Sequence, residues 1–439
     1  FGLLEAIREY ALYMLAGSEE EGPVRLRHAR YFFSLAEQAF VNQSGSRQLP
    51  LLASMDVDYI NVIAALNWLL SNGRHDSEIA ELAALMTSYL FYYWDWRGYF
   101  AEGREWIEQA LVLGDHVLWH NIPGNTDDVD NSTPTQQAAR LLKIRGRLLN
   151  GAGLHAWSLG DNDSALHLFN DALRVLSRLG NKQGMAAVLS NVAMLEGEQG
   201  LYGQAIETYK QAIEINRELG HGQVALALNN LGVVYWKSGD VENARAMYRE
   251  SLTLWRQMDD PGNMVLALDN LGIVAQYHEE YEAARHYQDE ALAICRTFGH
   301  KNSLAHVLAN MGSRAVAEGE FALAREYYLE LLPLLQQQNY YQVIVSCLEG
   351  IASLSHKLGR SLEAAWLWGA AEQMRRVNKQ SMGVLFIEQH EQNVAAALEQ
   401  CDPEAFQAAW SEGGAMLTHD ALTYAVARLG GHSKVGQEG

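Results

Sequence analysis

The sequence predicts an all-α protein: an α-α superhelix, or solenoid, of antiparallel helix pairs with a repeat of about 40 residues. Residues 225–256 contain two apolar stripes with the i, i+3, i+4 spacing of helices, joined at Gly239 and Asp240. Only 7 of the 439 residues are proline, which favours helix along the whole chain. A chain of this length exceeds a single core of roughly 250–300 residues, whereas a solenoid escapes that limit because each repeat contacts only its neighbours.

The helix pair recurs six times with fixed residue types. The turn residues are Gly160, Gly200, Gly239, Glu279, Gly319 and Gly359. Five residues after them stand Ala165, Ala205, Ala244, Ala284, Ala324 and Ala364, and seven before them stand Gly153, Ala193, Gly232, Gly272, Gly312 and Ala352. An aromatic follows five of the alanines, as Phe169, Tyr209, Tyr248, Tyr328 and Trp368, but the fourth repeat has Gln288. The small and bulky residues are placed to interlock within each pair. This pattern resembles the tetratricopeptide repeat, in a variety longer than the usual ~34 residues.

The same pattern divides the chain. We expect N-terminal helices over 1–50, degenerate helical repeats over 51–136 with an acidic loop at 113–136, six repeats over 137–378, capping helices over 379–429 and a disordered tail at 430–439. Outside the six repeats, the expected helices are 1–15, 24–40, 57–70, 79–94, 102–113, 384–400 and 403–428. In the degenerate pair, Gly98 takes the turn position and Gly103 replaces the alanine. The acidic loop is either a surface insertion or a partner-binding, regulatory loop.

Composition excludes several classes. The net charge of −20 argues against binding bare nucleic acid, since phosphate contacts need clustered Lys and Arg. The three widely spaced cysteines form no disulfide framework, which predicts a cytoplasmic location. No apolar run approaches the ~18 residues of a membrane span. The sequence also lacks GxxxxGK[ST], HExxH and GxSxG motifs and any Cys/His cluster at metal spacing, so we expect no enzyme activity, cofactor or metal site.

One polar position repeats on the first helices of the pairs, as Asn191, Asn230, Asn270 and Asn310. Asparagine is unfavourable inside helices, so four in register need an explanation. Either the amides line the concave groove and bind an extended peptide, or each amide ties its repeat to the next one; both can hold. Neighbouring positions on the same helices add Arg147, Trp157, Trp236, Lys237, Tyr277, His306, Arg314 and His356. Such a mixture suits a protein, a peptide or a small-molecule effector, although each aromatic could equally be packing.

Several stretches resemble the bacterial STAND-class regulatory ATPases, including LuxR-like and antibiotic-regulator transcriptional regulators. The opening FGLLEAIREYA (Phe1, Leu3, Leu4, Glu5, Ile7, Arg8, Glu9, Tyr10, Ala11) is similar to the end of their winged-helix region. Residues 27–39, 64–70, 97–111, 364–375 and 406–426 resemble the sensor region and its C-terminal cap.

This resemblance implies a sensor arm whose nucleotide-binding domain precedes Phe1 in the same polypeptide, and we expect the chain to be a fragment of such a protein. An effector in the groove would relieve autoinhibition. The alternatives are a constitutive interaction scaffold and the sensor of an NLR-like bacterial defence receptor. The aromatic run at 89–100 cannot all face inward, so we expect Trp94 or Trp96 to be exposed, where it could contact the ATPase domain.

Overall fold

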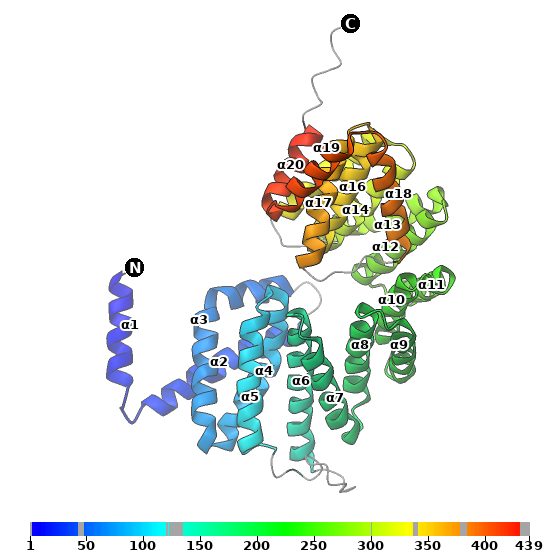
Figure 1. Cartoon of the computed structure of the whole chain (residues 1–439). Helices are drawn as coiled ribbons and strands as arrows, with labels where there is room; N and C mark the ends of the chain where they lie inside the picture. Colours follow the sequence, from blue (N-terminus) through cyan, green and yellow to red (C-terminus); the bar gives the residue numbers. More distant parts are fainter. Residues whose placement is uncertain are drawn as a thin grey trace. The chain divides into compact units, whose positions relative to one another are not determined.

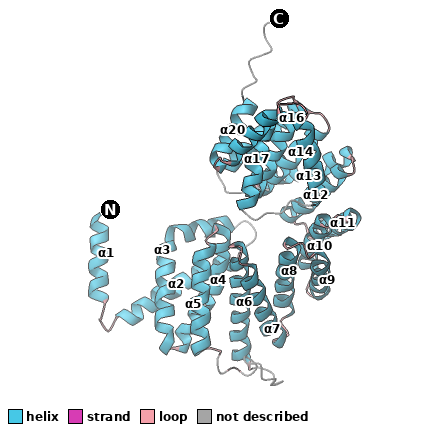
Figure 2. Ribbon diagram, viewed as in Figure 1, coloured by secondary structure: helices cyan, strands magenta, loops and turns pink. Residues whose placement is uncertain are grey.

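The computed structural model describes residues 2–42, 48–119, 122, 135–299, 301–336, 341–377 and 384–430. These residues form helices joined by turns, with no strand among them, which confirms the all-α prediction (Figure 2). The contacts divide the chain into two compact units, residues 1–195 and 196–439, which are described separately.

Unit 1 contains α1 (Gly2–Leu15), α2 (Glu21–Val41), α3 (Gln48–Asn72), the 3-10 helix η1 (Gly73–His75), α4 (Ser77–Arg97), α5 (Phe100–Val117), α6 (Gln136–Ser158), α7 (Asn162–Arg178) and most of α8 (Lys182–Glu198). Unit 2 contains α9 (Tyr202–Arg217), α10 (His221–Lys237), α11 (Val241–Gln257), α12 (Pro261–Tyr277), α13 (Tyr281–Phe298), α14 (Lys301–Ala317), α15 (Phe321–Gln336), α16 (Tyr341–Lys357), α17 (Ser361–Val377), α18 (Val384–Leu398), α19 (Pro403–Gly414) and α20 (Thr418–Gly430). Consecutive helices pair across short turns, as α6 with α7 and α10 with α11 (Figure 1). The same pairing joins α12 with α13, α14 with α15 and α16 with α17.

The turn within each pair explains the recurring glycine. Gly239 has a φ of 87°, a left-handed conformation that glycine adopts without steric cost. Asp240 follows it and starts the next helix, where its carboxylate accepts a hydrogen bond from the Asn243 N–H at 3.2 Å. Glu279 takes the same conformation, with a φ of 59°, at a cost of roughly 1–2 kcal/mol because it has a Cβ.

The small residue of the first helix receives the bulky residue of the second, as the sequence predicts. A Cβ built on Gly232 would lie 2.6 Å from the Tyr248 ring. The same close approach joins Gly153 to Phe169 and Gly312 to Tyr328. These rings are fully buried, so each of these three pairs is held by one aromatic side chain that lies on helix backbone without a Cβ.

The predicted last helix, 403–428, is wrong, because the structure has two helices there. α19 ends at Gly414 and α20 begins at Thr418. The break follows Gly413, whose Cα is pressed so closely against α17 that a Cβ would lie 1.9 Å from the carbonyl oxygen of Trp366. Gly369 on α17 is pressed equally against the Trp410 carbonyl oxygen. The two helices therefore cross backbone to backbone, and α20 turns back to stack Tyr424 on Trp366 at 3.9 Å.

Other helix boundaries also differ from the prediction. The helix predicted at 57–70 begins earlier, at Gln48, and α2 begins at Glu21, because Pro23 is tolerated in a first helical turn. The loop predicted over 113–136 is helical to Val117. It continues into a buried Trp119, whose indole N–H donates to Asp115 at 2.6 Å. The rest of that loop (120–121 and 123–134) and the tail predicted at 430–439, apart from Gly430, lie outside the described residues.

The degenerate pair behaves as predicted. Gly98 has a φ of 71°, in the left-handed region, and Gly103 is buried against the His155 ring. Trp94 is fully buried, whereas Trp96 is 41% exposed, so one of the two tryptophans does reach the surface.

The backbone crossing in the C-terminal cap gives a stability prediction. Gly369→Ala should lower the melting temperature by an amount equivalent to about 1–3 kcal/mol, because the contact is with backbone that cannot rotate away. Gly203→Ala on α9 is the matched control. Nothing lies within 4 Å of its added Cβ, so it should raise stability by up to about 1 kcal/mol. Thermal unfolding followed by circular dichroism measures both, and equal effects of the two variants would contradict the close crossing.

Candidate functional site

The four asparagines in register lie half-buried on the first helices of their pairs, and three of them donate to the preceding repeat. In unit 2 the Asn270 Nδ2 donates to the Asn229 Oδ1 at 3.1 Å, and the Asn310 Nδ2 donates to the Asp269 Oδ2 at 2.9 Å. In unit 1 the Asn191 Nδ2 donates to the Asn150 Oδ1 at 2.9 Å. These asparagines therefore tie successive repeats together. The acceptors, which the sequence analysis missed, were detectable as an Asn or Asp just before the ladder position.

Asn230 makes no such tie to a described residue. It lies near the Tyr209 hydroxyl on α9, where burial raises the pKa of Tyr209 and the Asn230 amide partly opposes this shift. Ser190 holds the acceptor position for Asn230 in the repeat pattern, and its hydroxyl donates to the Ala186 carbonyl at 2.9 Å. Among the described residues, the ties at Asn270 and Asn310 leave the Oδ1 of each amide without a hydrogen-bond donor.

In unit 2 these asparagines belong to a longer exposed stripe, which we call the asparagine face. It is formed by Leu226, Asn230, Val233 and Lys237 on α10, Leu266, Asn270, Ile273 and Tyr277 on α12, His306, Asn310 and Ser313 on α14, and Ser346, Ser353 and Lys357 on α16. These positions share one side of each helix. Neighbouring helices also meet across the face, since the Gln276 Nε2 donates to the Ser313 Oγ at 3.4 Å.

The other projected residues of unit 2 divide into exposed and buried ones. Tyr277 is 48% exposed and meets the Trp236 ring edge-on at 5.5 Å, while Trp236 is almost buried. Lys237 is half-buried and His306 is exposed. His356 is buried beneath the face near Trp368, and burial lowers its pKa.

In unit 1, the Arg147 guanidinium lies over the rings of Phe40 and Tyr89 at 5.4 and 5.6 Å. Trp157 is half-buried. Both residues lie on α6.

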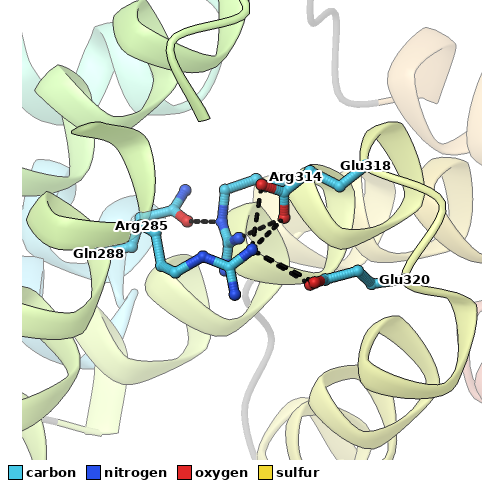
Figure 3. A network of polar contacts seen from close by, with 5 residues as sticks. All are labelled: Arg285, Gln288, Arg314, Glu318 and Glu320. Atoms are coloured by element: carbon cyan, nitrogen blue, oxygen red, sulfur yellow. Dashed lines mark hydrogen bonds and ion pairs between the residues drawn. The ribbon is translucent and has the colours of Figure 1, made fainter. Parts of the chain in front are cut away.

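Arg314 is fully buried, so its guanidinium does not reach the asparagine face. Its Nε donates to the Gln288 Oε1 at 2.7 Å, and its Nη1 lies 2.6 Å from the Glu318 carboxylate (Figure 3). Arg285 extends this network to Glu318 and Glu320, at 2.9 and 3.3 Å (Figure 3). Two arginines and two glutamates thus balance their charges at the junction of α13, α14 and α15.

The network arises where the repeat pattern departs from the aromatic. Gln288 fills the slot opposite Gly272, where a Cβ would lie 2.9 Å from its Cγ, and presents its amide to Arg314 of the next repeat. Arg314 itself occupies a core position, five residues before the turn, that holds Leu195, Val234, Val274 and Leu354 elsewhere. The first repeat has a buried His155 there, whose pKa burial lowers to about 4.

Changing both partners of this network tests their coupling. Arg314→Val should destabilise the protein by about 3–5 kcal/mol, because it strands buried polar partners. Gln288→Tyr removes the acceptor of a buried guanidinium and should also destabilise. The double variant restores the residue types found one repeat earlier, Tyr248 and Val274, and should recover most of the lost melting temperature. Additive losses in the double variant would contradict the coupling.

Asp269 introduces a pH dependence into the asparagine ties. Burial raises the pKa of its carboxyl to about 6, although the hydrogen bond from Asn310 opposes this shift. A carboxyl whose pKa is raised on folding favours the folded state when protonated. Its contribution is therefore fully present below the unfolded pKa and is lost as the pH rises through about 6.

Asp269→Asn should consequently stabilise the protein at pH 7.5, by up to about 3 kcal/mol, and by much less at pH 4.5. The variant reproduces the neutral Asn229–Asn270 tie of the preceding repeat. The converse Asn229→Asp should lose stability at pH 7.5. Urea unfolding at the two pH values measures this difference, and a gain that is independent of pH would disprove the buried charge.

The described part of the chain contains neither a membrane-spanning helix nor a metal-binding cluster. No helix there is both long and apolar enough to cross a bilayer. The described His, Cys, Asp and Glu side chains also include no group of three that could hold a metal ion.

Comparison with protein-family models identifies the repeats. The segments 145–218, 184–257, 223–297 and 263–337 each match the tetratricopeptide repeat model. Residues 145–337 are thus similar to tetratricopeptide repeats. The resemblance noted from the small–alanine–aromatic pattern is confirmed for this region, and the tetratricopeptide solenoid is the fold class of the protein.

Solved structures show the same fold over most of the chain. The apo quorum sensor NprR from B. thuringiensis is 16% identical with a TM-score of 0.52, covering 86% of this chain and 93% of its own. The Rap conjugation gene regulator of plasmid pLS20, in complex with the Phr* peptide, is 12% identical with a TM-score of 0.51, covering 81% and 96%. A Rap protein complexed with Competence and Sporulation Factor is also 12% identical, with a TM-score of 0.51, covering 82% and 99%. Likeness at such identities establishes the fold alone.

A curated relative matches part of the repeat region. Photosystem I assembly protein Ycf3 from Cyanophora paradoxa is 29% identical over 112 residues, which are 24% of this chain. The match spans 60% of the length of Ycf3.

Proposed function

We propose that this chain is the non-catalytic, ligand-binding arm of a STAND-class signalling ATPase, a cytoplasmic transcriptional regulator of the LuxR-like or antibiotic-regulator type. The tetratricopeptide fold is that of an interaction scaffold. The regulatory assignment rests on the resemblance of residues 1–11, 97–111 and 406–426 to that family. Its partners are a protein, peptide or small-molecule effector and the nucleotide-binding domain of the same polypeptide.

The asparagine face carries the binding proposal. Amides at regular spacing on successive helices offer hydrogen bonds at the repeat distance, and an extended peptide backbone has donors and acceptors to satisfy them. Two of the solved relatives have a peptide or a signalling factor in their complexes, which supports the same class of partner here. The proposed groove residues are Asn230, Trp236, Lys237, Asn270, Tyr277 and Asn310 in unit 2 and, taken separately, Arg147, Trp157 and Asn191 in unit 1. Arg314 and His356 support it from beneath, because both are buried.

A ligand acts as a switch only through different affinities for two states. The asparagines can give the ligand different affinities for two arrangements of the repeats, because the amides that contact the ligand also form the hydrogen bonds between repeats. An effector held by Asn270 and Asn310 would favour the arrangement in which their ties to Asn229 and Asp269 are made. That arrangement would be the one released from the nucleotide-binding domain.

Selection of a phage-displayed library of random dodecapeptides on the full chain tests the binding proposal. We expect enriched peptides whose binding is lost in the triple variant Leu226→Ala, Leu266→Ala, Tyr277→Ala, which leaves the asparagine ties intact. The matched control is Met258→Ala, Leu358→Ala, Leu362→Ala, which changes three side chains that are about as exposed but lie off the face. Peptides that bind both variants equally would place the site elsewhere, and failure to enrich any peptide would overturn the proposed peptide site.

The regulatory part has a separate test. The coding sequence upstream of the Phe1 codon should encode a nucleotide-binding module with a GxxxxGK[ST] motif. An upstream sequence that encodes only further repeats would favour the constitutive scaffold instead.

A further inference from the structure

Acidic residues are distributed unevenly between the two helices of each pair in unit 2. The chain has 53 acidic and 33 basic residues. The second helices of the pairs, α11, α13, α15 and α17, carry two or three acidic residues each. The first helices α10, α12, α14 and α16 contain only Asp269 and Glu349 between them.

Neither of these two carboxylates is available on the asparagine face. Asp269 is only 9% exposed and accepts the hydrogen bond of Asn310. Glu349 is held by the Arg375 guanidinium on α17. The face therefore presents no free carboxylate from the described residues of its four helices, although the molecule has a net charge of −20.

The face does present positive groups. Lys237 and Lys357 stand at the ends of α10 and α16 and form no ion pair with a described residue. The exposed His306 on α14 adds a polar ring rather than a charge, because desolvation lowers its pKa. Burial of the first helices does not explain why only acidic residues are missing, because burial disfavours lysine as strongly as glutamate. The described first helices expose no free carboxylate but keep two lysines on the face, so the face specifically lacks negative charge.

One part of the face is apolar. Leu226 and Leu266 occupy the same position in consecutive repeats and are 42% and 40% exposed. Tyr277 is 48% exposed on α12, and Val233 and Ile273 lie half-buried between these side chains and the helix ends. The positions corresponding to the leucines on α14 and α16 are His306 and Ser346, so the apolar part ends there.

We propose that the asparagine face binds an extended peptide with acidic side chains and at least one large apolar side chain. The apolar side chain lies on Leu226 and Leu266, and the carboxylates face Lys237 and Lys357. The neutral His306 ring offers a hydrogen bond to the same peptide. A protein of such negative charge repels an acidic peptide everywhere else, so the carboxylate-free face both admits and orients it. This inference rests on the proposed function and specifies the chemistry of its ligand.

The peptides enriched by the selection described above give the first test. Their sequences should contain more Asp and Glu, and more Leu, Ile or Phe, than the starting library. For the tightest binder, replacing its acidic residues by Gln should weaken binding roughly tenfold in 50 mM salt and less in 500 mM salt, because salt screens the charges. Fluorescence anisotropy of the labelled peptide measures the dissociation constants.

Charge reversal on the protein gives the second test. Lys237→Glu with Lys357→Glu should weaken the acidic peptide roughly tenfold or more and leave its Gln version nearly unchanged. Lys210→Glu with Arg249→Glu is the matched control, since it changes the net charge equally but lies on second helices, α9 and α11. The control should retain nearly all of the affinity.

The outcomes separate this inference from the proposed function. Enriched peptides without an excess of acidic residues, or equal effects of the two charge reversals, would overturn the acidic-ligand inference while leaving peptide binding in place. Failure to enrich any peptide would overturn both.

Discussion

The contact between a bare glycine and a large side chain is the constraint on which the repeats depend. Gly232 and Gly312 let the rings of Tyr248 and Tyr328 lie directly on helix backbone. Each ring fixes the separation and rotation of the two helices in its pair, because a Cβ at the glycine would overlap it. Once that rotation is fixed, the side of the first helix opposite the ring faces outward, and the asparagines lie along that side. The packing inside each pair therefore determines what the surface displays.

The junction of α13, α14 and α15 shows what happens when the aromatic is absent. Gln288 still fills the slot opposite Gly272, but it brings a buried amide that requires a partner. Arg314 supplies the partner and brings a charge, which Glu318 neutralises (Figure 3). Replacing the aromatic with Gln288 thus requires further polar residues to satisfy its hydrogen bonds and to neutralise the charge they bring. This coupling explains why Arg314 stands where the other repeats hold Leu, Val or His.

Much of the fold follows from the repeat pattern. The period of about 40 residues predicts where each turn lies and where a small residue of the first helix meets a bulky residue of the second. The sequence predicted the interlocking of small and bulky residues, as at Gly232 and Tyr248, and the turn at Gly98. It missed the break between Gly414 and Thr418, although two adjacent glycines weaken a helix there. The close approach of Gly413 to Trp366, which is distant in sequence, needed the structure. Helical spacing alone places Arg314 in the groove, which its burial contradicts. Comparison with Val234 and Val274 at the same repeat position would have indicated a core residue. The asparagine ladder was found from its register, but its acceptors needed the structure.

Ties and ligand contacts are compatible at the asparagines, because each side chain has more hydrogen-bonding groups than its tie uses. A crystal structure of the full chain with a selected peptide bound tests this claim most directly. The account predicts an extended peptide across α10, α12, α14 and α16, with main-chain groups bonded to Asn270 and Asn310 and the ties to Asn229 and Asp269 still present. A peptide bound against the second helices, or one that leaves these asparagines uncontacted, would contradict it.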